Sequence, residues 1–382
     1  MVGQSDPPFR TLCLQHGATC VYTEMLYASL VAGSLSYFNS RLQDVDHTFA
    51  AAGMSSEMYK SRPLVVQLCG HEPDVLAVAA ARIVDSGRAD AIDYNLGCPQ
   101  DRARDGLYGS FLLDKRHWDT VFRCVSSMVA AVGGRLPVTC KIRLCEDGVD
   151  IFNATEAFCR GLVGAGAAVI CVHGRTRGST KHRRAGPADL GMVGRLASAF
   201  VGVVPFVTNG NIVGRADVAS ALAAAAPCCG VMAAEGLLRD PALFQTSLPP
   251  PPDRLSLFLE YCSLSDAFFN AGGWAGLART DAAFEANTNR TGTGTDATDL
   301  DALSLQPHGR MKQVDVARSH LQWMLEKRGH GRTVRFTHLG PYRKHVNLLN
   351  ALRHSTTMIH LINIARECLV GVGESRLVDI ES

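Results

Sequence analysis

Short apolar runs alternate with helical patterns over residues 19–233. Each run has about the length of a strand, and its apolar character on successive positions is typical of strands buried on both faces. The predicted strands cover residues 19–23, 64–68, 91–95, 138–144, 168–173, 206–209 and 231–233, and the predicted helices between them cover 74–86, 118–132, 154–164, 190–199 and 216–226. This alternation predicts a parallel sheet with right-handed crossovers.

The order of these elements predicts a (β/α)8 TIM barrel. Seven strands are found, and the chain opens on a polar, proline-containing loop at residues 3–8 that leads into a helix near residues 9–16. We therefore expect the chain to begin at the carboxyl end of the first barrel strand, with that strand missing. A doubly wound open sheet is the alternative, although no glycine-rich turn follows an early strand.

The pattern changes after the four prolines at 249–252. Helices are predicted over residues 253–270, 311–328, 341–352 and 357–369. Threonine, glycine, aspartate and alanine dominate residues 271–307, which cannot bury much apolar surface and are expected to be a disordered insertion. The chain is thus predicted to consist of a barrel domain, residues 1–248, and a small basic α-helical domain, residues 249–382.

Positive charge is concentrated near the carboxyl end. The net charge of the chain is only +2, but residues 308–366 hold eleven lysines and arginines against two acidic residues. An excess of nine positive charges on one segment repels itself unless a partner offsets it, so we expect a polyanionic partner. A solvated helix face is the alternative.

Several classes of protein are excluded by composition. No run of 18 apolar residues is present, so no membrane span is expected. The start matches neither a signal peptide nor a transit peptide. The thirteen cysteines show no CxxC or zinc-ligand spacing, which predicts reduced thiols, no metal site and a cytoplasmic, possibly also nuclear, protein. Nothing indicates a protein partner, and a monomer is expected.

Polar side chains, nearly all of them hydrogen-bond donors, close most of the predicted strands. They are Gln67, Asn95, Lys141, Arg143, His173, Asn209 and Asn211. The carboxyl ends of parallel strands meet at one edge of a barrel, where barrel enzymes hold their chemistry. A ring of donors there fits an anionic, hydrogen-bond-rich ligand such as flavin mononucleotide (FMN), with its phosphate near the last two turns.

Cys98 follows the strand at 91–95, in the stretch AIDYNLGCPQD. The next residue is a proline, which has no N–H group to stabilise a thiolate. A thiol with an ordinary pKa of about 8.5 is mostly protonated at neutral pH and is better suited to donating a proton than to nucleophilic attack. A lone cysteine is more often a core residue, but the neighbouring Asn95, Gly97 and Pro99 favour a functional role.

These strand ends resemble those of the tRNA-dihydrouridine synthase family. The matching segments are MVGQSDPPFR at 1–10, VQLCG at 66–70, DAIDYNLGCPQ at 90–100, VTCKIRL at 138–144, VHGRTR at 172–177, TNGNI at 208–212 and GVMAAEG at 230–236. The sequences of the segments at 90–100 and 230–236 are most similar to those of the eukaryotic branch that acts on uridines 16 and 17 of the tRNA D-loop. The loop after HGRT departs from the family, since it lacks the usual Glu-Gln pair and tryptophan.

The resemblance implies an FMN enzyme that uses NADPH to reduce the C5=C6 bond of a tRNA uridine. Hydride would pass from reduced FMN to C6, and Cys98 would donate the proton to C5. The matching FMN-binding positions are Met1, Gln67, Lys141, His173, Asn209, Gly210, Asn211, Ala234 and Glu235. Asn95, Arg143, Arg175 and Arg177 are the candidate substrate-binding residues.

An enzyme that reduces a stacked uridine must pull it out of the tRNA, which requires a grip on the backbone nearby. The candidate backbone contacts are Lys181, Arg183, Arg184, Arg310, Lys312, Arg318, Arg335, Arg343 and Lys344. Two alternatives to this function remain open. One is an FMN-barrel oxidoreductase for a small molecule, similar to dihydroorotate dehydrogenases. The other is a truncated, non-catalytic tRNA-binding protein that has lost its flavin with the first strand.

Overall fold

The computed structural model describes residues 4–42, 63–146, 150–178, 186–245, 252–270 and 313–325, together with 351–352, 358 and 360–368. These residues belong to two compact units. The described part of the first unit comprises residues 19–42, 63–146, 150–178 and 186–234. The second contains residues 4–18 and the described residues from 235 onward. The predicted insertion at 271–307 and most of the predicted helix at 341–352 lie outside the described residues.

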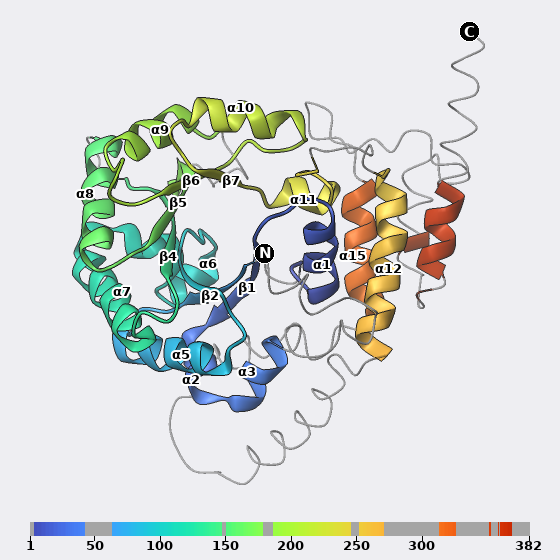
Figure 1. The fold of residues 1–382 in the computed structure, drawn as a ribbon, viewed down its shortest axis with the longest axis horizontal. Coiled ribbons are helices and arrows are strands. Elements are labelled where there is room, and N and C mark those ends of the chain that lie inside the picture. Colours follow the sequence, from blue (N-terminus) through green and yellow to red (C-terminus); the bar gives the residue numbers. More distant parts are fainter. Residues whose placement is uncertain are drawn as a thin grey trace. The chain divides into compact units, whose positions relative to one another are not determined.

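The first unit is built on one parallel sheet. In its described part the sheet has seven strands, which pair in chain order from β1 to β7 and curl around a common interior (Figure 1). Their bounds are β1 Val21–Tyr27, β2 Leu64–Cys69, β3 Ala91–Leu96, β4 Val138–Leu144, β5 Val169–Thr176, β6 Phe206–Asn209 and β7 Gly230–Met232. All seven sequence-predicted strands are confirmed. The unbroken order excludes a doubly wound sheet, in which strand order reverses at a switch point.

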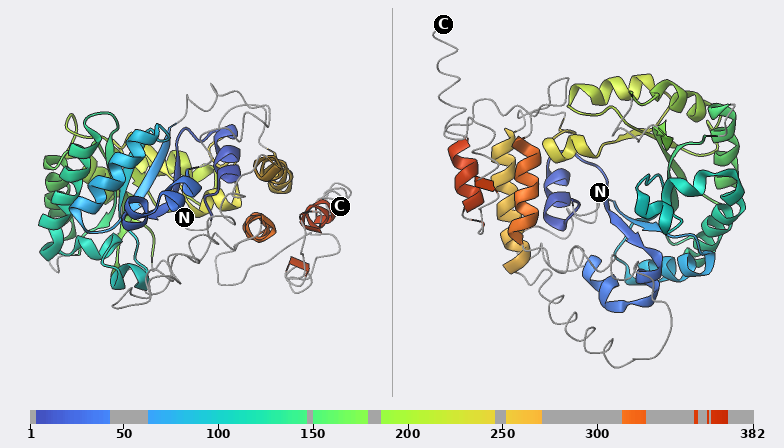
Figure 2. Two further views of the ribbon diagram at one scale, coloured as in Figure 1. Left: turned by 90° about the horizontal axis from the view of Figure 1, so that it is seen from below. Right: turned by 180° about the vertical axis from the view of Figure 1, so that it is seen from behind.

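Five helices cover the outer face of this sheet (Figures 1 and 2). Their bounds are α5 Pro73–Ser86, α7 Trp118–Val132, α8 Ile151–Gly164, α9 Leu190–Ser198 and α10 Ala216–Ala224. Strand β3 shows how the sequence produces this layering. Ile92, Tyr94 and Leu96 are fully buried in the core between strands and helices. Asp93 and Asn95 alternate with them and therefore face the interior of the curled sheet.

Short elements that the sequence did not reveal shape the strand-end loops. They are the helices α2 Ala28–Gly33, α3 Leu35–Arg41 and α6 Asp101–Asp105, and the 3-10 helices η2 Gly109–Leu113 and η3 Lys115–His117. Each spans three to seven residues, too few for a periodic hydrophobic pattern. The strand β1 also differs from its prediction. It begins at Val21 rather than residue 19, and an irregularity between Tyr22 and Met25 interrupts its pairing with β2.

The second unit is helical. It contains α1 Pro7–Gln15, α11 Glu235–Arg239, α12 Arg254–Asn270 and α15 Gln313–Leu325, and residues 360–368 are also helical. Helix α12 packs against both α1 and α15, and α12 and α15 lie side by side (Figure 1). Within the described residues, no helix has the length and apolar character needed to cross a membrane.

A buried polar cluster joins three segments of the second unit. The Asp6 carboxylate lies 2.7 Å from Nε2 of His320 and accepts a 3.0 Å hydrogen bond from the Tyr261 hydroxyl. The ring of Phe9 stacks on that of His320 with 4.5 Å between centroids. Burial alone would raise the pKa of Asp6, but the opposing effects of His320 and the Tyr261 hydrogen bond lower it overall. Residues that precede the first strand thus form part of the helical core.

Candidate active site at the carboxyl ends of the strands

The register of the sheet brings the predicted strand-end residues next to one another. Gln67 pairs with Asp93, which pairs with Thr139 on the other side. One step further along the strands, Asn95 pairs with Lys141 and Lys141 with Cys171. Arg143 pairs with His173, and His173 with Asn209. Because side chains of paired residues lie on the same face, these polar groups share the interior of the curled sheet.

A chain of hydrogen bonds links the interior of the sheet to the Cys98 loop. Gln67 Nε2 donates to Asp93 Oδ2 at 2.8 Å, and Asn95 Nδ2 donates to Gln67 Oε1 at 2.8 Å. Asn95 Oδ1 then accepts from the backbone N–H groups of Gly97, at 3.1 Å, and Cys98, at 3.0 Å. The side chains of Gln67 and Asn95 therefore form one unit with the loop that carries the thiol.

Asp93 is the site residue that the sequence analysis missed. Its side chain is fully buried, and its second oxygen accepts a 2.7 Å hydrogen bond from the Thr139 hydroxyl. Burial raises the pKa of Asp93 to about 6, against the opposing effects of the Thr139 and Gln67 hydrogen bonds. The signal was present in the sequence, because Asp93 precedes Asn95 by two positions and so lies on the same face of the strand.

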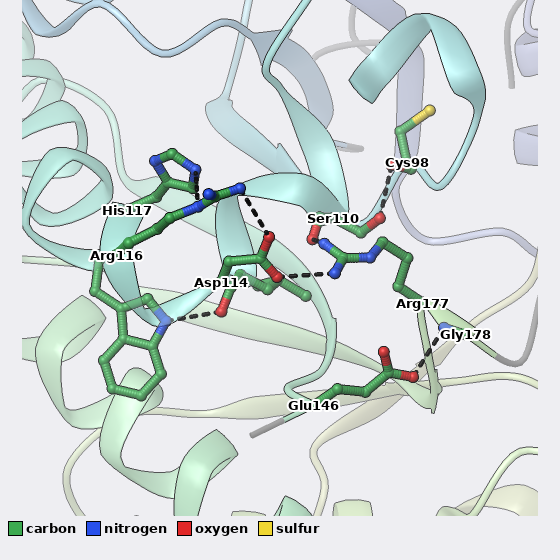
Figure 3. A network of polar contacts seen from close by, with 10 residues as sticks. Cys98, Ser110, Asp114, Arg116, His117, Glu146, Arg177 and Gly178 are labelled. Carbon is green, nitrogen blue, oxygen red and sulfur yellow. Dashed lines mark hydrogen bonds and ion pairs between the residues drawn. The ribbon is translucent and has the colours of Figure 1, made fainter. Parts of the chain in front are cut away.

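Cys98 is half-buried and held by its own backbone. Its carbonyl oxygen accepts from both the N–H and the hydroxyl of Ser110, each at 2.9 Å (Figure 3). Gly109 has a φ of +65°, and a Cβ there would lie 2.6 Å from the Cys98 carbonyl oxygen, so only glycine fits. Burial raises the pKa of the Cys98 thiol. The thiol is therefore protonated at neutral pH, as a proton donor requires.

Arg177 fixes the segment that follows Cys98. Its guanidinium donates to the Ser110 carbonyl at 3.0 Å and to Asp114 Oδ1 at 2.8 Å (Figure 3). It also lies over the Phe111 ring, 4.8 Å from the centroid. Because Ser110 holds Cys98 and Arg177 holds Ser110, the arginine acts on the position of the thiol through η2.

Arg143 and Arg175 also bind loop atoms of the protein. Arg143 donates to the carbonyl oxygens of Gly97, at 2.8 Å, and Thr176, at 3.2 Å. Burial and the nearby Arg175 lower the pKa of Arg143 to about 10. Arg175 donates to the Gly186 carbonyl and to Asn211 Oδ1, each at 3.1 Å. The arginines predicted to bind substrate thus hold the strand-end loops together.

His173 contacts the guanidinium of Arg175. Arg175 Nη1 lies 3.0 Å from His173 Nε2, and since a guanidinium only donates, Nε2 must be the unprotonated acceptor.

Gly210, in the turn after β6, has a φ of +123°, and a Cβ at this position would lie 2.5 Å from the Ala188 Cβ. Asn211 holds the same loop, because its amide bonds both the N–H and the carbonyl of Ala188.

Lys141 differs from the other predicted site residues. Among the residues that the structure describes, none forms a hydrogen bond or ion pair with its ammonium group, and burial lowers the pKa of that group. Asn209 donates to the Met232 carbonyl at 2.7 Å, which ties the end of β6 to β7.

The remaining predicted positions lie at the end of the first unit, in the second unit or outside the described residues. Ala234 ends the first unit, and Glu235 begins the second, where it forms a 3.5 Å ion pair with Arg239. Of the predicted tRNA contacts in the helical part, Arg318 lies on α15. Met1, Lys181, Arg183, Arg184, Arg310, Lys312, Arg335, Arg343 and Lys344 lie outside the described residues.

A parallel strand-helix fold with a donor-rich site at its strand ends defines an α/β protein of the kind that places its chemistry at that edge. The family model described as "Dihydrouridine synthase (Dus)" matches residues 1–260. The chain therefore belongs to the dihydrouridine synthase family.

Curated relatives agree with this family. The chain is 35% identical over 244 residues to a tRNA-dihydrouridine(16/17) synthase [NAD(P)(+)] of Saccharomyces cerevisiae, covering 64% of this chain and 52% of the relative. It is 36% identical over 250 residues to a "tRNA-dihydrouridine(16/17) synthase [NAD(P)(+)]-like" protein of Rattus norvegicus, covering 65% and 51%. The chain thus spans about half the length of these relatives.

Proposed function

We propose that this chain is a tRNA-dihydrouridine synthase that reduces uridines 16 and 17 of the D-loop with FMN as cofactor and NADPH as reductant. The observation that carries the proposal is Cys98, a half-buried thiol with a raised pKa, held at a strand end by Asn95 and Ser110. The family match and the names of the relatives support the substrate and the reductant.

The residues present fit a flavin. Lys141 is a cation without a described protein partner, and Gln67 and Asn95 each keep one amide hydrogen after their observed bonds. Gly210 lets the backbone after β6 lie close to Ala188 and His173, where a Cβ would be only 2.5 Å from the Ala188 Cβ. FMN, when bound, supplies the hydride for C6 of the uracil ring. We infer that Gln67, Lys141, His173, Asn209, Gly210, Asn211, Ala234 and Glu235, together with Met1, hold it.

Cys98 completes the reduction by donating the proton of its thiol to C5 of the uracil ring. General acid catalysis of this kind contributes roughly 10²- to 10⁴-fold. Asn95 is positioned to donate its remaining amide hydrogen to a uracil carbonyl oxygen, since its own oxygen is occupied by two backbone N–H groups. Lys141 offsets the negative charge of a reduced flavin ring.

Contacts to the tRNA backbone are proposed for the basic carboxyl-terminal segment, which includes Arg318. Arg143, Arg175 and Arg177 remain candidates for substrate contacts, beside the loop contacts that they make within the protein. Phosphate contacts release counterions, so the affinity for tRNA should fall steeply with salt. We further propose a cytoplasmic location, in keeping with thirteen cysteines that are all described and all free of disulfides.

The proposal is tested with purified protein, FMN, NADPH and unmodified tRNA. We expect NADPH oxidation that depends on tRNA and dihydrouridine at positions 16 and 17 of the product. NADPH oxidation with small pyrimidines that carry an unreduced C5=C6 bond, such as orotate, in place of tRNA would instead favour a small-molecule oxidoreductase. A protein that binds tRNA but takes up no FMN would be non-catalytic, and the proposal would be wrong.

A further inference from the structure

We propose that Asp93 is a positioning residue. It fixes the orientation of the Gln67 amide, so that Gln67 presents an N–H donor, and not an oxygen, to the ligand of the strand-end site. The inference rests on the proposed function, because it takes that ligand to be FMN. It assigns a role to a residue that the proposed mechanism does not itself use.

The Asn95 amide has a fixed orientation. The N–H groups of Gly97 and Cys98 both meet one atom of its amide, at 3.1 and 3.0 Å. Backbone N–H groups only donate, so that atom must be the oxygen, Oδ1. The other end of the amide, Nδ2, is therefore a donor, and it faces Gln67.

Gln67 lies between Asn95 and Asp93. Its Oε1 accepts from Asn95 Nδ2, and its Nε2 donates to Asp93 Oδ2. A reversed amide would place two NH₂ groups together at Asn95 and two oxygens together at Asp93. An ionised carboxylate only accepts, so Asp93 and Asn95 select the same orientation of Gln67 from opposite sides.

Burial of the Asp93 carboxylate has a free-energy cost. A buried carboxylate is unfavourable unless its oxygens are hydrogen-bonded. Among the described residues, its side-chain partners are Gln67 and Thr139, on the neighbouring strands β2 and β4. Thr139 needs no such partner, because a hydroxyl can turn toward a backbone carbonyl. The contact for which an acceptor is required is therefore the one to Gln67.

These contacts leave a defined set of polar groups for a ligand. After the observed bonds, Gln67 Nε2 and Asn95 Nδ2 each retain one hydrogen, while the oxygens of both amides already accept. This edge of the site therefore suits carbonyl oxygens, such as those of a flavin or uracil ring, and disfavours amino groups. A Gln67 amide turned by half a rotation would present an oxygen to the ligand in place of the Nε2 donor.

The test is a double-mutant cycle with two readouts, the melting temperature and the dissociation constant for FMN measured by fluorescence quenching. Gln67→Glu sets two carboxylates against each other and should lower the melting temperature and weaken FMN binding at least tenfold. Adding Asp93→Asn restores a donor that faces the introduced glutamate, so the melting temperature should recover. FMN binding should stay weak, because the glutamate offers the ligand only oxygen atoms.

Single variants separate orientation from charge. Asp93→Asn can still accept from Gln67 while its own NH₂ donates to Thr139, so FMN affinity should stay within about threefold of the wild-type value. Asp93→Ala removes the acceptor and should weaken FMN binding at least tenfold. Thr139→Val removes the other donor to the same carboxylate and serves as the control, with unchanged FMN affinity.

Four outcomes would overturn the inference. Equal losses in Asp93→Asn and Asp93→Ala would assign the effect to charge. Recovery of FMN affinity together with the melting temperature in the double variant would show that a donor at position 67 is not required. Equal FMN affinity in all variants would remove Asp93 from the site and leave the proposed function standing. A wild-type protein that takes up no FMN would overturn both.

Discussion

At the scale of single residues, burial decides the protonation states that the site needs. Cys98 is held in a partly buried position that raises the pKa of its thiol, and the following proline supplies no N–H group that would lower it. Asp93 is buried more deeply, and its carboxyl remains ionised at neutral pH because its raised pKa is still only about 6. Burial thus keeps the Cys98 thiol protonated, whereas the Asp93 carboxyl stays an acceptor at neutral pH because the hydrogen bonds of Thr139 and Gln67 oppose the effect of burial.

Replacement of Cys98 tests the proton donor. We expect Cys98→Ala to retain FMN and tRNA binding and to slow single-turnover reduction of uridine by about 10²- to 10⁴-fold. Ionisation of the Cys98 thiol should not change the wild-type rate near neutral pH. It should lower the rate only above pH 9, since burial raises the pKa of this thiol from that ordinary value. Cys20→Ala, at an exposed thiol, is the control. An unchanged rate in Cys98→Ala would contradict the assignment.

Asp93 should make stability depend on pH. Its pKa is about 6 in the folded protein, against an ordinary value of 3.8 for an aspartate in the unfolded chain. A raised carboxyl pKa gives stability that is complete below the unfolded value and is lost as pH rises through the folded value. The shift of about two units corresponds to roughly 3 kcal/mol.

Denaturant unfolding of wild type and Asp93→Asn at pH 5 and pH 8 measures this effect. Because the introduced asparagine cannot ionise, the stability of the variant relative to wild type should increase by about 1 to 2 kcal/mol between these pH values. A difference that is the same at both pH values would mean that the folded-state pKa of Asp93 is ordinary.

At the scale of elements, the 3-10 helix η2 connects the thiol to the rest of the strand-end loops. Ser110 at its start bonds Cys98, while Arg177 from the end of β5 bonds Ser110 and Asp114. The position of Cys98 therefore depends on contacts between loops that follow different strands. Small displacements of a reacting group cost rate steeply, about 10²-fold for 1 Å.

Arg177→Ala and Asp114→Ala distinguish loop positioning from tRNA binding. Both variants break the 2.8 Å ion pair, so both should lower kcat about tenfold or more with KM for tRNA within about threefold. Only the first removes a positive charge. If Arg177→Ala raises KM while Asp114→Ala leaves both constants unchanged, Arg177 serves mainly as a tRNA contact.

The strands and long helices were predictable because their patterns are local. The helix at 118–132 and the strands at 138–144 and 206–209 were predicted to the residue. The donor ring followed from the two-residue period of strands. The partners of Arg143, Arg175 and Arg177 were not predictable, since they are loop carbonyls and side chains brought near by the packing of distant segments. The short helix α6 and the 3-10 helix η2 carry too few residues for a pattern.

At the scale of the whole molecule, the described residues of the helical unit come from two parts of the chain, one before the sheet and one after it. Residues 4–18 precede β1, yet Asp6 and Phe9 pack in the core around Tyr261 and His320. The sequence suggested a single boundary near residue 248, because composition changes there. A contact between residues more than 300 positions apart leaves no local trace in composition.

Loss of the Asp6 carboxylate tests this arrangement. Asp6→Ala leaves buried His320 and the Tyr261 hydroxyl without their shared hydrogen-bond partner, and each buried polar group left unsatisfied costs about 1 to 3 kcal/mol. We expect such a loss in the free energy of unfolding. Gln4→Ala removes a neighbouring 2.6 Å hydrogen bond to Ser319 and is the control, with a cost of about 1 kcal/mol. Equal, small effects of both variants would contradict a structural role for Asp6.

Residues 4–18 belong to the helical unit, and this limits which chimeras of this protein and a relative can fold. A chimera that exchanges the helical part with a relative by splicing at one late position would pair a foreign Tyr261 and His320 with the native Asp6. A compatible exchange must transfer two separated stretches of chain, one from each side of the strand-helix region. Trimming of the first eighteen residues would likewise remove a helix from the core of the part that follows residue 234.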